Sequence, residues 1–459
     1  MRVPEGDKNS SLQRIANEVE TVGVLPVENS QRKMTATQLF IVWAMASASA
    51  TTPVLGFLLY NMGFANMVVA ILVAFLIGAV PAGLFSEMGR EIPLTALIVA
   101  RRTYGRVGAL LFALFFTFVN VGWFGLNTEV GGQILSAIFH TTGEFWFWSM
   151  GAVQVVLVLF GMKWLEYFYR YTSLVLVVCY GALTVYLFTH YHVHLPSASG
   201  PILWGQVLTT VLTFSILSWT YKVSTVSRFA VPAAETPRRS GYFLAPSVGI
   251  MLSVLLMSCV GMLSQAATGN WNVAAFGSQI PVWGVVAAFG VALAVIHTNA
   301  LNLYPSTIDL LVALNTVKKP AKWEEPVATV VLGAISTLLA IYGILNKIQN
   351  FLNITGDVIF PFTFIMLVDW ISVQRKRTPV AAFYDRPTTS AGWLALPAVL
   401  AWLVGFALNY WGADFLPPFF YNTLPLPVVG SLVSAVLYWI VAPGRRAQSD
   451  DADTSQPTA

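Results

Sequence analysis

The sequence predicts an all-α integral membrane protein of about twelve transmembrane helices. Its composition is the first observation: 56% of the 459 residues are hydrophobic and only 10% are charged, whereas soluble domains carry about 25% charged residues. The second observation is a series of apolar runs, most of them near the roughly 20 residues that cross a bilayer. The third is the position of the basic residues between these runs, which gives the protein an orientation.

The apolar runs divide the chain into twelve predicted spans. They cover 36–60, 64–88, 107–137, 145–162, 166–189, 204–227, 242–266, 281–311, 327–346, 348–373, 390–411 and 422–442. With the N-terminus in the cytoplasm, the cytoplasmic segments hold 23 of the 25 lysines and arginines, as the positive-inside rule requires. The even count then places both termini in the cytoplasm, and we expect a multi-pass protein of the inner or plasma membrane.

One membrane domain accounts for nearly the whole chain. We assign residues 36–443 to it, with polar cytoplasmic tails at 1–35 and 444–459. The basic residues follow the spans rather than one soluble face, so we expect no nucleic acid partner. The cysteines show no disulfide or zinc pattern. His190, His192 and His194 in one outer loop could bind a metal, but we interpret this loop as solvated and expect neither a metal nor a cofactor. The oligomeric state stays open and is compatible with a monomer.

Two predicted spans carry helix-breaking or polar residues. Span one contains the small, hydroxylated run 46–52 followed by Pro53, and span six crowds hydroxyl groups around Lys222. Because these spans lie five apart, the pattern is typical of inverted-repeat transporters, whose binding site lies near the membrane midplane. Close helix packing through small residues is the alternative explanation.

Lys222 falls within a predicted span and is not among the 23 basic residues of the cytoplasmic segments. An ammonium group at bilayer depth costs about 2.5–3.5 kcal/mol on insertion scales. It therefore needs a carboxylate, backbone carbonyls or a wet cavity, unless it snorkels to the interface. Glu129 in span three is the candidate partner, although it lies about 120° from Trp123 on the helical wheel and faces another direction.

Two polar stripes complete the set of candidate residues. Asn120, Trp123 and Asn127 share one face of span three, and a tryptophan beside two amides suits a flat polar ring. A packed tryptophan with amides joining helices is the alternative. Span eight carries a second stripe and two flanking residues: Thr298, Asn302, Ser306 and Asp309, with His297 and Asn299. Asp309 would be solvated if it lies at the interface.

Four segments of the sequence resemble the nucleobase–cation symporters of the purine–cytosine permease type. They are ETVGVLPVENSQRKMTATQLFIVWAMASAS, REIPLTALIVARRTYGRVGALL, NVGWFG and FLNITGDVIFPFTFIMLVDWISVQRKR. The order and spacing of these segments follow the family, which includes the cytosine permease and the hydantoin transporter. The second segment contains the Gly-x-x-Gly turn that leads into span three.

The resemblance implies a LeuT-type fold with two inverted five-helix repeats and two added helices. The repeats would cover about 36–189 and 204–373, and the added helices 390–442. The family's substrate ring is held between aromatic residues of spans three and six, which here are Trp123 and Trp219. The substrate-binding candidates are therefore Trp123, Asn127, Trp219, Asn302, Asn299 and Ser218.

The sequence departs from the family at two positions that concern the coupling ion. On span six the family's acid is missing from the run 223–229, and Lys222 stands just before it. On span eight Ile296 and His297 replace the paired hydroxyl residues of sodium-coupled members, although Thr298 restores a partial site in a shifted register. We therefore expect protons to be favoured over sodium. The coupling or charge-relay candidates are Lys222, Glu129, His297 and Thr298.

The resemblance implies a permease that imports cytosine, a purine, hydantoin, allantoin or a related flat heterocycle. A carrier of an amino acid or vitamin precursor on the same fold is the alternative, as is a membrane receptor that does not transport. An enzyme is excluded because the spans contain no HExxH or CxxC motif and no paired catalytic carboxylates.

Overall fold

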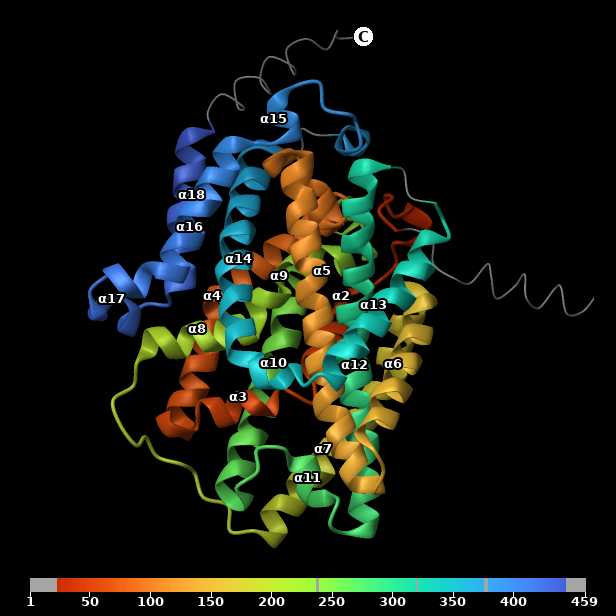
Figure 1. Ribbon diagram of the computed structural model, residues 1–459, viewed down its shortest axis with the longest axis vertical. Coiled ribbons are helices and arrows are strands. Elements are labelled where there is room, and N and C mark those ends of the chain that lie inside the picture. Colours follow the sequence, from red (N-terminus) through yellow and green to blue (C-terminus); the bar gives the residue numbers. More distant parts are fainter. Residues whose placement is uncertain (1–22, 237–238, 319–320, 375–378, 443–459) are drawn as a thin grey trace, which may run out of the picture.

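The computed structural model describes residues 23–236, 239–318, 321–374 and 379–442. Within these residues the chain is helical and has no β-strand, only an isolated bridge between Met34 and Ala230. The helices form an elongated bundle, with α5 (Ala96–Phe139) running along its length (Figure 1). The predicted all-α architecture is confirmed.

The other helices follow one another with short connections. In chain order they are α2 (Ala36–Ser47), α3 (Pro53–Leu58), α4 (Phe64–Glu91), α6 (Gly143–Leu159), α7 (Gly161–His190), α8 (Trp204–Phe214), α9 (Ile216–Ser227), α10 (Arg239–Thr268), α11 (Val273–Gly277), α12 (Pro281–Val317), α13 (Glu324–Ile341), α14 (Ile348–Asp369), α15 (Ser390–Trp393), α16 (Leu396–Phe415), α17 (Pro418–Thr423) and α18 (Leu426–Val441).

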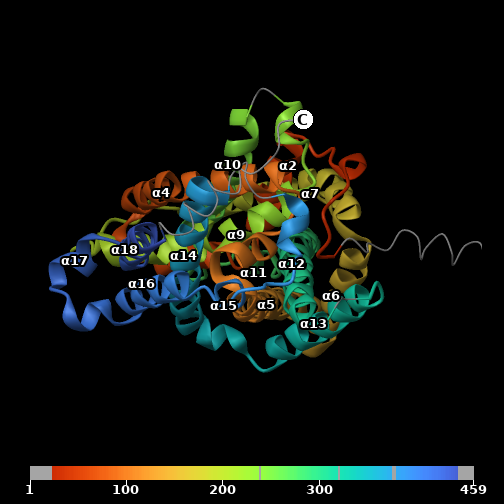
Figure 2. The same cartoon turned by 90° about the horizontal axis from the view of Figure 1, so that it is seen from above.

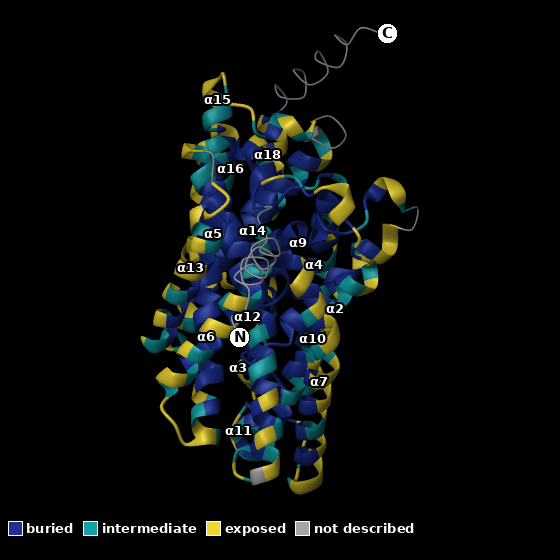
Figure 3. Ribbon diagram, turned by 90° about the vertical axis from the view of Figure 1, so that its right-hand side faces the viewer, coloured by how far each residue is buried: buried dark blue, intermediate teal, exposed yellow. Residues whose placement is uncertain are grey.

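Eight helices of the described chain are long and apolar enough to cross a membrane. The spans predicted at 36–60 and 204–227 each consist of two shorter helices, and α6 and α18 are also short, so the count of twelve stays a prediction. Many exposed positions lie on the outer faces of the bundle (Figure 3). Large apolar side chains are among the exposed residues, such as Leu76 and Leu174, which are 70% and 69% exposed. An apolar surface of this extent fits lipid rather than water.

The first interrupted span breaks where the sequence predicts. Helix α2 ends at Ser47, and α3 begins at Pro53, where the missing proline N–H would have had no helical partner in any case. Helix α10 passes α3 so closely that a Cβ on Gly261 would lie 2.1 Å from the Pro53 carbonyl oxygen. Only glycine fits this contact, which fixes the half-helix after the break.

The second interrupted span breaks at Ser215, between α8 and α9. The dihedral angles of Ser215 are −117° and −113°, far from helical values. Its carbonyl accepts a hydrogen bond from the Ser218 hydroxyl at 2.8 Å, so a side chain satisfies a group that the break has freed. The predicted turn before span three also exists, because Gly105 has a φ of +79° within α5.

Two groups of helices lie on opposite sides of the central pair α5 and α12. Helices α16 and α18 pack against each other and against α14 on one side, whereas α6, α7 and α13 lie on the other (Figures 1 and 2). The broken span α8–α9 lies between these groups and contacts α4 and α14. The two breaks therefore lie in the interior of the bundle rather than at its lipid surface.

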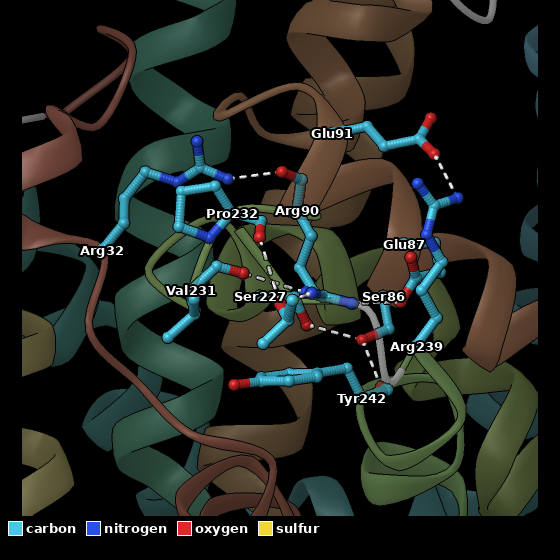
Figure 4. A network of polar contacts seen from close by, with 11 residues as sticks. Arg32, Ser86, Glu87, Arg90, Glu91, Ser227, Val231, Pro232, Arg239 and Tyr242 are labelled. Carbon is cyan, nitrogen blue, oxygen red and sulfur yellow. Dashed lines mark hydrogen bonds and ion pairs between the residues drawn. The ribbon is translucent and has the colours of Figure 1, made fainter. Parts of the chain in front are cut away.

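A polar network joins four segments at the predicted cytoplasmic end (Figure 4). Arg90 on α4 forms an ion pair with Glu87 at 2.6 Å and donates to the Val231 carbonyl at 3.0 Å and the Thr236 hydroxyl at 2.6 Å. Its guanidinium lies 3.8 Å from the ring centre of Tyr242 on α10. These contacts tie the end of α4 to the segment after α9 and to the start of α10.

Candidate functional site

A small cavity lies where the two helix breaks face the middle of α5. Residues from six segments line it: Ala46, Ser47, Ser49, Thr51, Thr52, Trp123, Asn127, Phe214, Ser218, Trp219, Lys222, Val254 and Thr298. Its volume is about 20 Å³, which is room for about one water molecule. A heterocyclic ring would fit only after the surrounding side chains move apart.

Aromatic rings form two walls of this cavity. Trp123 on α5 packs edge-on against Phe214, with ring centres 5.6 Å apart, and Trp219 on α9 packs edge-on against Trp43 at 5.7 Å. Both tryptophans are 8% exposed. Because both indoles line the cavity, a flat ligand bound there would contact them.

Side-chain hydroxyl groups donate hydrogen bonds to backbone carbonyls at the first break. The Thr52 hydroxyl donates to the Ser47 carbonyl at 2.7 Å, and the Thr298 hydroxyl on α12 donates to the Ala46 carbonyl at 2.7 Å. Thr51 donates to the Asn127 amide oxygen at 2.9 Å. By contrast, the buried Ser47 hydroxyl has no partner within the described chain, so it can bind a ligand or water in the cavity.

Lys222 is buried in the wall of the cavity. Its ammonium donates to the Asn302 amide oxygen at 3.0 Å and lies 4.1 Å from the ring centre of Trp219, a cation–π distance. The side chain is only 2% exposed, so it does not snorkel to an interface. The Asn302 amide in turn donates to Asn299 at 3.4 Å, which places both candidate asparagines behind the lysine.

An acidic group lies further along α12. Asp309 is buried, and its carboxylate accepts from the Asn120 amide at 3.2 Å. Asn120 accepts from the Tyr221 hydroxyl at 3.2 Å, which links Asp309 to α9. Asp309 is therefore part of the interior polar network, and the interpretation of a solvated interfacial residue is wrong.

Two of the candidate residues point away from the cavity. Glu129 accepts from the Leu345 amide at 2.7 Å and from Gln133 at 3.2 Å, so it does not pair with Lys222 in this structure. His297 lies 2.6 Å from the Thr172 hydroxyl on α7. Both directions follow from the helical wheel, because His297 is turned by about 100° from Thr298 and Glu129 by about 120° from Trp123.

The structure brings most of the predicted substrate residues together. Trp123, Asn127, Ser218 and Trp219 line the cavity, whereas Asn299 and Asn302 form the layer behind it. Sequence reasoning missed Phe214 and Val254, which carry no polar signal. Phe214 could have been noticed as the aromatic residue just before the polar run of span six.

A family model for permeases of cytosine and purines, uracil, thiamine and allantoin matches residues 26–440. The chain belongs to the nucleobase–cation symporter family. A Bacillus subtilis protein provisionally named a purine-cytosine permease is 25% identical, with 92% of this chain and 95% of the relative aligned. The hydantoin permease of Microbacterium maritypicum is 23% identical, over 75% of this chain and 72% of the permease.

Solved structures agree on the LeuT-type fold. The nucleobase–cation symporter Mhp1, closed with bromovinylhydantoin bound, superposes with a TM-score of 0.76 over 95% of this chain and 99% of that protein, at 17% identity. Its inward-facing conformation gives a TM-score of 0.71 at 18% identity, over 95% and 98% of the two chains. The expected fold is confirmed, and the division into repeats stays a prediction.

The geometry of this symporter cavity suits recognition without covalent chemistry. Two indoles offer aromatic surface, the Ser47 hydroxyl offers an unused polar group, and Lys222 offers N–H donors beyond its bond to Asn302. Such a site binds a flat solute through its faces and one polar edge.

Proposed function

We propose that this symporter imports a nucleobase or related flat heterocycle, such as cytosine, a purine, hydantoin or allantoin, by alternating access. One observation carries the proposal: Trp123 and Trp219 line the same buried cavity, at the two helix breaks and beside Lys222. In transporters with broken helices, the breaks supply backbone groups to a midplane site while the helix bundles rock around it.

The polar edge of the solute would meet Lys222 and the first break. The ammonium has one hydrogen-bond acceptor in the described chain, so a ring carbonyl or anionic ring nitrogen would take a further N–H donor. The Ser47 hydroxyl and the Asn127 amide would contact the rest of the edge. An analogue without a matching group would leave these buried groups unpaired, which is the physical basis of discrimination.

The small volume of the cavity supports alternating access. The cavity has a volume of about 20 Å³, whereas pockets for drug-sized ligands are typically about 300–1,000 Å³. The site is therefore closed in this structure. Loading therefore requires Trp123 on α5 to separate from the broken span α8–α9, which carries Phe214 and Trp219. Movement of that span would open the site to one side at a time.

We favour protons over sodium as the coupling ion. The Thr298 hydroxyl and the Ala46 carbonyl meet at the first break but are hydrogen-bonded to each other at 2.7 Å. Neighbouring His297 is turned toward α7 and supplies no oxygen there. Hard cations bind several oxygen ligands, so this pair alone is a poor sodium shell, whereas the buried Lys222 offers a fixed or exchangeable positive charge.

Substitution of one tryptophan tests the stacking site. A thermal-shift screen of purines, pyrimidines, hydantoins, amino acids and vitamin precursors would first identify a ligand and separate the alternative solutes. Trp123→Ala should then weaken binding about 10–100-fold, because stacking on an aromatic ring is worth about 1–3 kcal/mol per base. The protein should still insert and purify as before.

A lipid-facing tryptophan provides the matched control. Trp148 on α6 is 46% exposed, so Trp148→Ala should leave the affinity unchanged. Normal affinity in Trp123→Ala would contradict the stacking model. Counterflow in liposomes separates a carrier from a receptor, since exchange of labelled for unlabelled solute requires alternating access.

A further inference from the structure

A second and larger cavity opens at the predicted cytoplasmic end, away from the tryptophans. Its volume is about 480 Å³, and four parts of the chain line it. They are the described N-terminal segment at residues 23–25, α5 at Arg106, the end of α12 with the residues after it, and the segment 384–393. None of its lining residues belongs to the central cavity.

The charge of this cavity is strongly positive. Arg106, Lys318, Lys322 and Arg386 line it, against the single acidic residue Glu325. Lys318 is paired with Glu324 outside the lining. Arg106 and Arg386 approach the cavity from segments far apart in the sequence, and buried Arg101 lies five residues before Arg106. None of these three arginines forms an ion pair within the described residues.

These arginines also keep unused hydrogen-bond donors. Arg101 donates one N–H to the Val312 carbonyl and Arg106 donates one to the Asn315 carbonyl, each at 3.2 Å. The end of α12 carries a partial negative charge, which explains those two bonds. Three further donors, Nε and Nη1 of Arg101 and Nε of Arg106, are buried without an acceptor in the described chain. Unmet donors of a charged group are costly.

We propose that this cavity binds a phosphate-type oxyanion, supplied by an anionic phospholipid headgroup or by free phosphate. A guanidinium donates in pairs to the oxygens of such an anion, and one anion would offset the positive charge of Arg106, Lys322 and Arg386 in the lining. Basic pockets between helices on the cytoplasmic side are a known form of headgroup site. The cavity is large enough for a headgroup with its glycerol.

The bound anion would hold the predicted cytoplasmic end closed. Val24 lines the cavity and accepts a hydrogen bond from Tyr384 at 2.5 Å, and burial raises the pKa of Tyr384 to about 12, so its hydroxyl stays a donor. Gly23 accepts from Arg228 at the end of α9 at 3.1 Å. An anion here would therefore bridge segments that must separate when the site opens inward.

Thermal unfolding of the full-length protein in phosphatidylcholine nanodiscs tests this site without any solute. One arm adds potassium phosphate against potassium chloride at equal ionic strength and pH. The other replaces part of the phosphatidylcholine by phosphatidylglycerol. A rise of the unfolding midpoint that saturates with phosphate indicates a soluble anion, and a rise only with phosphatidylglycerol indicates a headgroup. Either supports the proposal, whereas no rise in both arms overturns it.

Single substitutions place the effect at the cavity. Arg106→Gln and Arg386→Gln should each weaken the apparent affinity for the stabilising anion about tenfold, the value of one charge-assisted hydrogen bond. Arg386 is exposed, so its variant should fold even where Arg106→Gln does not. Arg239→Gln is the control, because that half-exposed arginine pairs with Glu91 elsewhere. Unchanged affinity in Arg386→Gln and in folded Arg106→Gln would contradict the site.

Discussion

Two buried cations in this symporter have opposite surroundings. Arg90 is 1% exposed and Lys222 is 2% exposed, and each lies over an aromatic ring. Arg90 donates to three different residues, whereas Lys222 donates within the described chain to Asn302 alone. Lys222 also lines a cavity. A cation whose donors are used joins helices, and a cation with spare donors beside a cavity is available to a ligand.

Substitution of Arg90 should have the largest effect on stability. Arg90→Met removes every contact of the guanidinium and leaves Glu87 buried without its partner, which typically costs about 3–5 kcal/mol. We expect a strongly lowered unfolding midpoint and poor yield of the purified protein. Arg239→Met, at a half-exposed ion pair with Glu91, should lose little, because surface pairs contribute about 0–1 kcal/mol.

A second substitution at this network sharpens the same test. Glu87→Gln combined with Arg90→Met removes the charge that the single variant leaves unpaired. The double variant should therefore recover part of the lost stability. An additive loss in the double variant would show that packing, rather than the pairing of charges, makes Arg90 important.

Substitution of Lys222 should weaken binding of the solute and leave the stability of the protein intact. Lys222→Met removes a buried charge with one acceptor, so the unfolding midpoint should stay the same or rise. Loss of a charge-assisted hydrogen bond to the solute should weaken its binding about 10–100-fold, which corresponds to about 1.5–3 kcal/mol. The solute-dependent thermal shift and the uptake into liposomes measure this. A loss of stability like that of Arg90→Met, with normal affinity, would make Lys222 a structural residue.

The sequence was sufficient for those features that depend on local chemistry. Pro53 and the hydroxylated run before it indicated the first break, and Lys222 marked the second broken span as unusual. The face shared by Trp123 and Asn127 needed only helical periodicity. These signals lie within a few neighbouring residues, so no tertiary structure was needed to recognise them.

Features that depend on helix register or on contacts between distant segments could not be predicted from the sequence. Lys222 meets Asn302, which is 80 residues away, while the proposed partner Glu129 faces Leu345. A difference of one residue decides that Thr298 rather than His297 contacts the first break. The approach of Arg106 and Arg386 depends on how segments about 280 residues apart pack together, which residue patterns do not reveal.

Removal of sodium should have the smallest effect on uptake. It tests whether Lys222, rather than a bound sodium ion, couples transport. If Lys222 itself carries the coupling proton, uptake into liposomes at constant pH should change by less than about twofold, or about 0.4 kcal/mol, when choline replaces sodium. An inward proton gradient should stimulate uptake by the parent protein but not by Lys222→Met. Thr298→Ala should resemble the parent, because its hydroxyl is already bonded to Ala46. Collapse of uptake without sodium would show that the first break binds this ion after all, with Lys222 serving the solute alone.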